Sequence, residues 1–156
     1  MAGEQYVDKA VVKLKDFIES NLPTQLRAVE SAQSLTASSL TDPVEVIGNR
    51  APFDNRSPLV EVYDENWDFI DLNNKIISVD CTVTVSFISD ADIGAGELFM
   101  RRYVTAVINT IMADPTLGGQ VVAAILTDGS PAISRGDNAL TRFVYAQGVE
   151  VHVHEG

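Results

Sequence analysis

Residues 77–87 carry the clearest pattern in the chain, because apolar and polar side chains alternate there without a break. The polar positions hold serine, threonine or aspartate. The apolar positions are Ile77, Val79, Cys81, Val83, Val85 and Phe87. Successive side chains of a strand point to opposite faces, so the alternation predicts a long strand with one apolar face. That face needs a cover, and the expected cover is a helix over residues 96–112 with a broad apolar stripe.

The first 32 residues predict helical structure in two pieces. Apolar side chains recur at helical spacing through residues 5–21, with charged side chains on the opposite face. Asn21-Leu22-Pro23 is expected to interrupt this helix, because the residue before a proline is disfavoured in the helical region. The helix is expected to resume from Thr24 to about Ala32. The Ser/Thr-rich residues 33–43 are expected to form a linker.

Two short strands are predicted before the central one. Val44–Ile47 is the first, and Leu59–Tyr63 follows a polar loop at Gly48–Pro58. Asp64-Glu65-Asn66 is expected to form a turn, because aspartate and asparagine favour turns. Trp67–Ile70 is then expected to return as a hairpin partner.

The last third of the chain predicts two more strands. Val121–Leu126 is a continuous apolar run, which is typical of a strand covered on both faces. Asp128–Pro131 is expected to be a turn and Ile133–Ala139 a polar loop. Alternation returns through residues 143–153, where Gly148 indicates a bulge or a change of partner.

The order of these elements favours an α+β fold. Runs of strands around isolated helices predict a mostly antiparallel sheet, packed by an N-terminal helix and a long central helix. The length suits a single domain over residues 1–156. Within it, residues 5–32 form the helical segment, residues 33–43 the linker, and residues 44–156 the sheet with the long helix.

The charge excludes some classes of partner. Eleven basic residues against 22 acidic ones leave a net charge of −11, whereas nucleic-acid and anionic-membrane surfaces need clustered Lys and Arg. Residues 42–75 hold eight acids and three bases, a net charge of −5.

The N-terminal residues are too polar for a signal peptide, and no apolar run approaches the ~20 residues of a membrane span. Cys81, the single cysteine, is expected to be a buried thiol, which suits a reducing compartment.

One stretch has the context of a phosphate site. Gly94-Ala95-Gly96 lies between a predicted strand and a predicted helix. A third glycine is missing and nearby acids would repel a phosphate, so a helix cap and turn is favoured over an anion site. The helix is expected to begin after Asp92, whose side chain suits an N-cap, or after this glycine pair.

The histidines and serines give no stronger indication of a metal site or of catalysis. His152 and His154 share one face of the last strand, where a solvated polar face is favoured over a metal site. Zinc would lack its other usual ligands. Ser130 and Ser134 have neither a neighbouring histidine nor the glycines of a nucleophile elbow.

The densest group of acids in the sequence also favours a solvated surface over an ion-binding site. It consists of Asp64, Glu65, Asp68 and Asp71. Apolar side chains interrupt the group, so a solvated hairpin is favoured over a calcium loop. The sequence therefore predicts no catalytic residue, no cofactor and no metal, and the protein is not expected to be an enzyme.

Four residues are candidates for a protein interface. Trp67 lies among acids, and Arg50, Arg56 and Arg135 lie in long loops of an otherwise acidic chain. Trp and Arg on projecting loops are frequent anchors of interfaces. The alternative, that Trp67 folds under its own hairpin, stays open.

Several features of the chain occur together in one known family. An N-terminal helix leads into Asn21-Leu22-Pro23-Thr24-Gln25-Leu26, and a Pro/Arg loop precedes Leu59–Tyr63. The long alternating strand, a helix containing Arg101-Arg102-Tyr103 and a closing pair of strands follow. In the order and texture of these elements the chain resembles the tail terminator (tail completion) proteins of long-tailed bacteriophages.

The resemblance implies a structural role in the virion. A tail terminator forms a hexameric ring on the last ring of tail-tube protein, stops tube growth and offers a surface to head-side neck proteins. The implied partners are other copies of this chain, the tail-tube protein and a neck protein, assembled in the bacterial cytoplasm. DNA would pass through the ring without specific binding, and part of the acidic excess is hypothesised to line its channel.

Two other functions remain as alternatives. One is another neck or minor tail component, such as a head-closure protein. The other is a small-molecule-binding α+β domain that uses the Gly94–Gly96 turn.

Overall fold

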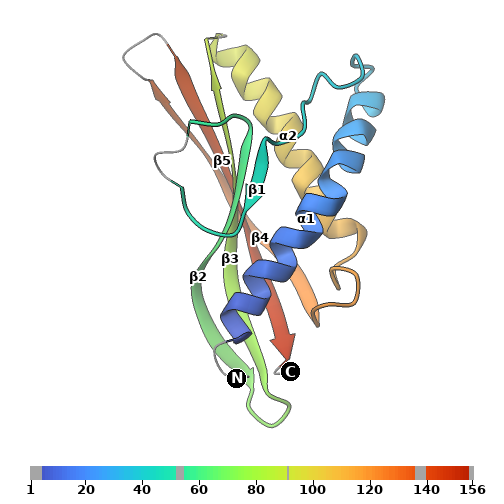
Figure 1. Ribbon diagram of the computed structural model, residues 1–156, viewed down its shortest axis with the longest axis vertical. Helices are drawn as coiled ribbons and strands as arrows, with labels where there is room; N and C mark the ends of the chain where they lie inside the picture. Colours follow the sequence, from blue (N-terminus) through green and yellow to red (C-terminus); the bar gives the residue numbers. More distant parts are fainter. Residues whose placement is uncertain (1–4, 52–54, 91, 136–139, 155–156) are drawn as a thin grey trace.

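The computed structural model describes residues 5–51, 55–90, 92–135 and 140–154, and Figure 1 shows two helices lying across a twisted sheet. The α+β fold with a mostly antiparallel sheet, predicted from the sequence, is confirmed. The elements in chain order are α1 (Gln5–Ala32), β1 (Glu45–Ile47), β2 (Leu59–Asp71), β3 (Ile76–Ser89), α2 (Ile93–Ala113), β4 (Ala123–Arg135) and β5 (Thr141–His154).

The sheet has the strand order β1-β2-β3-β5-β4, so the strand with the strict alternation, β3, is central. Its neighbours β2 and β5 are antiparallel to it, and β4 is antiparallel to β5. The short β1 is parallel to β2 and pairs only with Leu59–Glu61. The sheet therefore ends in β4 on one side and in most of β2 on the other.

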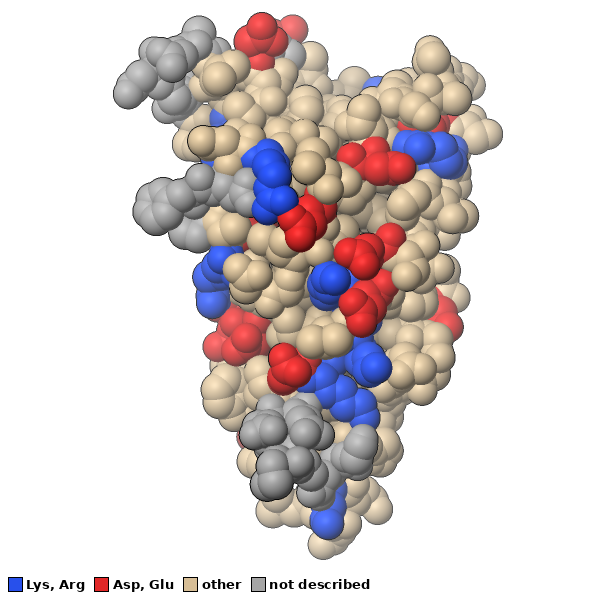
Figure 2. All heavy atoms as spheres, viewed as in Figure 1, with Lys and Arg blue, Asp and Glu red and all other residues tan. Residues whose placement is uncertain are grey.

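Both helices pack on the apolar face of β3, which explains why that face is buried. Helix α1 contributes Leu14, Ile18, Leu22 and Leu26, and α2 contributes Met100, Tyr103 and Val107, all of them buried. Full burial of each large apolar side chain stabilises the fold by roughly 1.5–3 kcal/mol. The opposite face, called the helix-free face below, carries the polar positions of β3, including Thr84 and Ser86. On the face in view in Figure 2, acidic and basic side chains lie interspersed.

The predicted interruption of the first helix is wrong. Helix α1 is continuous, with Pro23 inside it. Leu22 and Leu26 on either side of the proline are both buried in the core, and their burial outweighs the local cost of the proline. Asn21 adds a local contact, because its side-chain Nδ2 donates to the carbonyl of Phe17 at 2.9 Å.

The predicted turn at Asp64-Glu65-Asn66 is also wrong. Strand β2 runs through it without reversing, and Trp67 and Phe69 pair with Val79 and Ile77 of β3. The acidic stretch is accommodated by a register shift between Asp64 and Asn66, which is a β-bulge rather than a turn. The chain reverses only after Asp71, where β2 ends.

Strand β4 differs from its prediction in two ways. Asp128–Pro131 lies within the strand, and β4 continues to Arg135, so neither the turn nor the start of the expected loop at Ile133 is correct. The bulge predicted at Gly148 is confirmed: it lies in the partner strand β4, between Leu126 and Gly129, directly opposite Gly148. The expected cover on both faces is absent from the described chain, because Ile125 is 45% exposed.

The start of α2 agrees with the prediction of a cap. Asp92 is the N-cap residue, and its Oδ1 accepts a hydrogen bond from the backbone N–H of Ala95 at 2.8 Å. Gly96 lies directly against the ring of Phe143, where a Cβ would be 2.0 Å from Cζ of that ring. This glycine serves close packing of α2 on β5.

The segment after α1 is held against both helices. Glu30 is buried and accepts a hydrogen bond from the backbone N–H of Leu40 at 2.8 Å. Arg27 donates to the carbonyl of Leu40 and lies 2.8 Å from the carboxylate of Glu30. On α2, the hydroxyl of Tyr103 donates to the carbonyl of Thr41 at 2.9 Å. The Ser/Thr-rich linker is thus anchored at its end.

Candidate functional site

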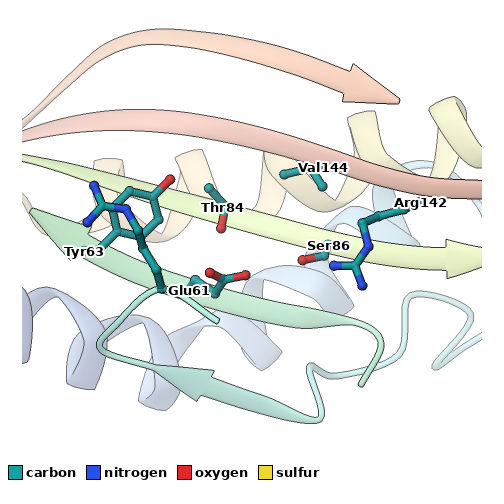
Figure 3. Close-up of a pocket in the computed structure, with 7 residues that line it drawn as sticks. Glu61, Tyr63, Thr84, Ser86, Arg142 and Val144 are labelled. Atoms are coloured by element: carbon teal, nitrogen blue, oxygen red, sulfur yellow. The ribbon is translucent and has the colours of Figure 1, made fainter. Parts of the chain in front are cut away.

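A shallow hollow of about 290 Å³ lies on the helix-free face of the sheet (Figure 3). Figure 3 shows Tyr63 and Arg142 toward opposite ends, with the hydroxyls of Thr84 and Ser86 between them. Strands β2, β3 and β5 supply these side chains, because alternate residues of adjacent strands share a face. The lining residues are Arg50, Glu61, Tyr63, Thr84, Ser86, Arg142 and Val144.

Arg50 is fixed within its own chain. Its guanidinium carbon lies 4.1 Å from the centre of the Tyr63 ring, which is a cation–π contact. The same group lies 3.4 Å from the carboxylate of Glu65 and donates to the carbonyl of Asp64 at 3.3 Å. Burial raises the pKa of Tyr63, the charge of Glu65 raises it further, and the charge of Arg50 opposes both.

The other charged groups of the hollow are also engaged. Glu61 accepts a hydrogen bond from the backbone N–H of Ala51 at 2.9 Å, and Arg142 donates to Oδ1 of Asn55 at 3.2 Å. The described lining residues include three hydroxyls, those of Tyr63, Thr84 and Ser86, but no histidine, lysine or cysteine beside them. The arrangement thus offers polar contacts, and its charges are already used to hold the loop before β2.

A second polar cluster lies on the same face, toward the end of β5. Glu150 accepts a hydrogen bond from the hydroxyl of Ser78 at 3.0 Å and lies 2.7 Å from Nε2 of His152. These bonds, from His152 first and Ser78 second, lower the pKa of Glu150. Both hydrogen bonds go to the carboxylate, so Ser78 is not positioned against the histidine as a nucleophile would be. His154 contacts the carbonyl of Asn74 instead, at 3.4 Å.

Cys81 is buried, as its place in the alternation predicts. Burial raises the pKa of its thiol to about 12, and the charges of Asp64 and Asp80 add to the effect. Because the thiolate is the reactive form, this cysteine is inert near neutral pH.

The described part of the chain contains neither a cluster of metal ligands nor a membrane-spanning helix. Its His, Cys, Asp and Glu side chains form no group of three suited to a metal ion. None of its helices is both long enough and apolar enough to cross a membrane.

Comparison of the sequence with protein-family models gives no match, and no curated protein matches it. The resemblance to tail terminators therefore stays a prediction from the sequence.

The outer half of β2 exposes large apolar side chains. Trp67 is 54% exposed and Phe69 is 55% exposed, and both share the face of Val79 and Ile77 near the start of α1. The Phe69 ring meets the Tyr6 ring edge-on, with centroids 6.4 Å apart. Trp67 therefore does not fold under a hairpin of its own, since no such hairpin forms.

The two remaining interface candidates lie elsewhere. Arg56 forms an ion pair with Glu45 of β1. Arg135 ends β4, where its backbone pairs with Thr141, and its side chain lies outside what is described. The four candidates thus do not form one patch. Their contact with a partner stays a prediction.

Sequence reasoning missed the second exposed region, which lies at the β4 end of the sheet. Val122, Ile125 and Ile133 are each more than a third exposed there. The signal in the sequence is the apolar run Val121–Leu126 itself, which predicts a strand covered on both faces. On an edge strand the same run leaves apolar side chains available to a neighbour.

Proposed function

We propose that this chain is a tail terminator of a long-tailed bacteriophage, a virion protein that closes into a hexameric ring on the tail tube. The ring stops tube growth and presents a surface to head-side neck proteins. The resemblance described above supplies the identity of the partners.

One observation carries the proposal: the sheet ends in two unlike edges, and both expose apolar side chains. Trp67 and Phe69 lie at the β2 edge, and Ile125 and Ile133 at the β4 edge. A contact between unlike surfaces repeats from copy to copy, and it makes a ring when the rotation closes. Large exposed apolar side chains at strand edges are typical of surfaces that become covered on assembly.

The proposal is tested by assembling phage tails with and without this protein. Tails made without it should have tubes of uncontrolled length in electron micrographs, and adding the protein back should restore a single length. Purified protein, or protein bound to tube ends, should give rings of six copies by mass measurement. Tubes of normal length in its absence would rule the proposal out.

A further inference from the structure

The hollow on the helix-free face contains two hydroxyl groups that have no hydrogen-bond partner in the described chain. Thr84 is 6% exposed and Ser86 is 2% exposed, and both lie on one face of β3. No hydrogen bond within the described residues involves either hydroxyl, and Figure 3 shows both groups inside the hollow. Buried polar side chains normally have a partner, so these hydroxyls mark a place where a bound molecule completes the hydrogen bonding.

The register of the sheet explains why the surface is hollowed at these residues. Thr84 lies opposite Glu61 of β2 and Ala146 of β5, so short side chains meet there on β3 and β5. The long side chains of Tyr63 and Arg142 stand toward the two ends of the hollow (Figure 3). Because the side chains of a strand project roughly perpendicular to the sheet, short ones between long ones leave a depression.

The walls of the hollow are held in place by contacts within the chain. Arg50 stacks on Tyr63 and pairs with Glu65. Oε2 of Glu61 accepts the hydrogen bond from the backbone N–H of Ala51, whereas Oε1 accepts none within the described chain. Side chains that are fixed before a ligand arrives lose little conformational freedom when it binds.

The charges of the hollow favour a neutral ligand over an ion. An anion would lie near Glu61 and a cation near Arg50 and Arg142, so each would meet a like charge. The opposite charges in the hollow are already engaged within the chain. A ligand with hydroxyl groups avoids this penalty, because one hydroxyl can donate to Glu61 while another accepts from Thr84 or Ser86.

The size of the hollow and the spacing of its hydroxyls suit a single sugar ring. Its volume of about 290 Å³ is at the lower end of the ~300–1,000 Å³ of typical ligand sites, so it accommodates one ring rather than an oligosaccharide. Thr84 and Ser86 are two residues apart on a strand, about 6.6 Å, a spacing that hydroxyls on opposite sides of a six-membered ring can bridge. Val144 offers an apolar contact to the C–H groups of the ring.

We propose that this hollow binds one neutral sugar unit through the hydroxyls of Thr84 and Ser86 and through Oε1 of Glu61. The inference does not rest on the ring proposed above, because the hollow is complete within one chain.

Titration of isotope-labelled protein with the methyl α-glycosides of glucose, galactose and mannose, followed by NMR, tests this assignment. At least one glycoside should shift the amide signals of Glu61–Tyr63, Thr84–Ser86 and Arg142–Val144 along a saturating curve, with a dissociation constant of about 1 mM or lower. Acetate and methylammonium, two small probes that carry one charge each, should give no saturating shift of these signals.

Two outcomes of the titration would overturn the inference. One is saturation by acetate or methylammonium without saturation by any glycoside, which would assign the hollow to an ion. The other is the absence of saturation by all three glycosides at concentrations well above that dissociation constant, which would leave water as the occupant.

Removal of the two hydroxyls gives a second measurement. Thr84→Val combined with Ser86→Ala nearly keeps the shape of the hollow and should weaken glycoside binding at least tenfold. Because neither hydroxyl has a partner in the described chain, the melting temperature should stay the same or rise.

Ser130→Ala is the matched control. Ser130 lies on the same face, opposite Ala146, but is not among the described residues that line the hollow. Undiminished glycoside binding by the double variant, or an equal loss in Ser130→Ala, would contradict the assignment. A marked fall in the melting temperature of the double variant would also contradict it, since the hydroxyls would then serve the fold.

Discussion

Gly96 is the residue at which α2 comes closest to the sheet. A methyl group there would overlap the Phe143 ring, whose Cζ would be 2.0 Å away, and both partners belong to rigid elements of the core. We expect Gly96→Ala to lower the free energy of unfolding by about 2 kcal/mol through overpacking, despite the better helix propensity of alanine.

Denaturant unfolding measures this change. Gly48→Ala serves as the control, because its added Cβ would make only ordinary contacts, the nearest at 3.6 Å from Val11. A stability loss at Gly48 equal to that at Gly96 would show that the Phe143 contact is not the cause.

Glu30 gives the fold a dependence on pH. Burial alone would raise the pKa of this carboxyl, but hydrogen bonds from the backbone N–H groups of Leu40 and Ser38, with the charge of Arg27, outweigh it and lower the pKa. A lowered pKa in the folded state means that the carboxylate stabilises the fold above its ordinary pKa. That contribution is lost as the pH falls through the folded-state value.

Glu30→Gln should therefore lower the melting temperature by several degrees near pH 7, and the difference from wild type should shrink as the pH falls below the ordinary pKa of a glutamate and through the lowered folded-state value. Thermal unfolding across this range is the measurement. Glu19→Gln, which removes only a surface pair with Lys15, should have little effect at any pH. A gap between wild type and Glu30→Gln that stays constant with pH would contradict the assignment.

Among the elements, α1 shows how core burial overrides a local signal. Pro23 cannot donate a hydrogen bond to the preceding turn, yet the helix continues because the flanking leucines are buried. Pro23→Ala should therefore raise the free energy of unfolding by about 1 kcal/mol or more.

The measurement is again denaturant unfolding, with Pro115→Ala as the control. Pro115 follows α2 outside any helix, so its replacement frees the unfolded chain without repairing a helix and should not stabilise the protein. Equal stabilisation by Pro23→Ala and Pro115→Ala would show that the effect does not depend on Pro23 lying inside α1.

Strands β3 and β5 could be predicted because each has one buried and one polar face, and alternation records that difference directly. The cap at Asp92 was also readable, since capping depends on residues close in sequence. The course of β2 could not be predicted in this way. Asp64–Asn66 has the composition of a turn, and only pairing with β3 keeps it extended. Gly129 and Pro131 also have the composition of a turn, but both lie within β4, because an edge strand tolerates glycine and proline.

The candidate site was harder to predict than the fold. Arg50 and Trp67 were singled out from the sequence, but the stacking of Arg50 on Tyr63 depends on how the loop after β1 meets the sheet. The β4 edge was missed because the position of a strand at the edge of a sheet follows from topology, which alternation does not encode.

At the scale of the whole molecule, the net charge of −11 is relevant to the channel of the proposed ring, through which DNA would pass. The helix-free face is the polar face of the sheet, and Asp80 and Glu150 lie on it opposite one another in β3 and β5. If this face lines the channel, its carboxylates keep passing DNA from adhering, because like charges repel.

Replacing both acids with their amides (Asp80→Asn with Glu150→Gln) should leave ring assembly and tail length intact and slow the release of DNA from assembled phage. Release into buffer at low ionic strength is the measurement, and Asp16→Asn on α1 is the control. Loss of rings in the double variant would place these acids in an interface instead.

The part of β2 beyond its pairing with β1, from Glu65 to Asp71, also affects how readily the chain aggregates with identical copies. Identical extended segments stacked in register, as in an amyloid fibre, lie about 4.7 Å apart. In such a stack Glu65, Asp68 and Asp71 would each form a column of negative charge beside the aromatic rings. These acids therefore oppose in-register stacking of this segment with identical copies.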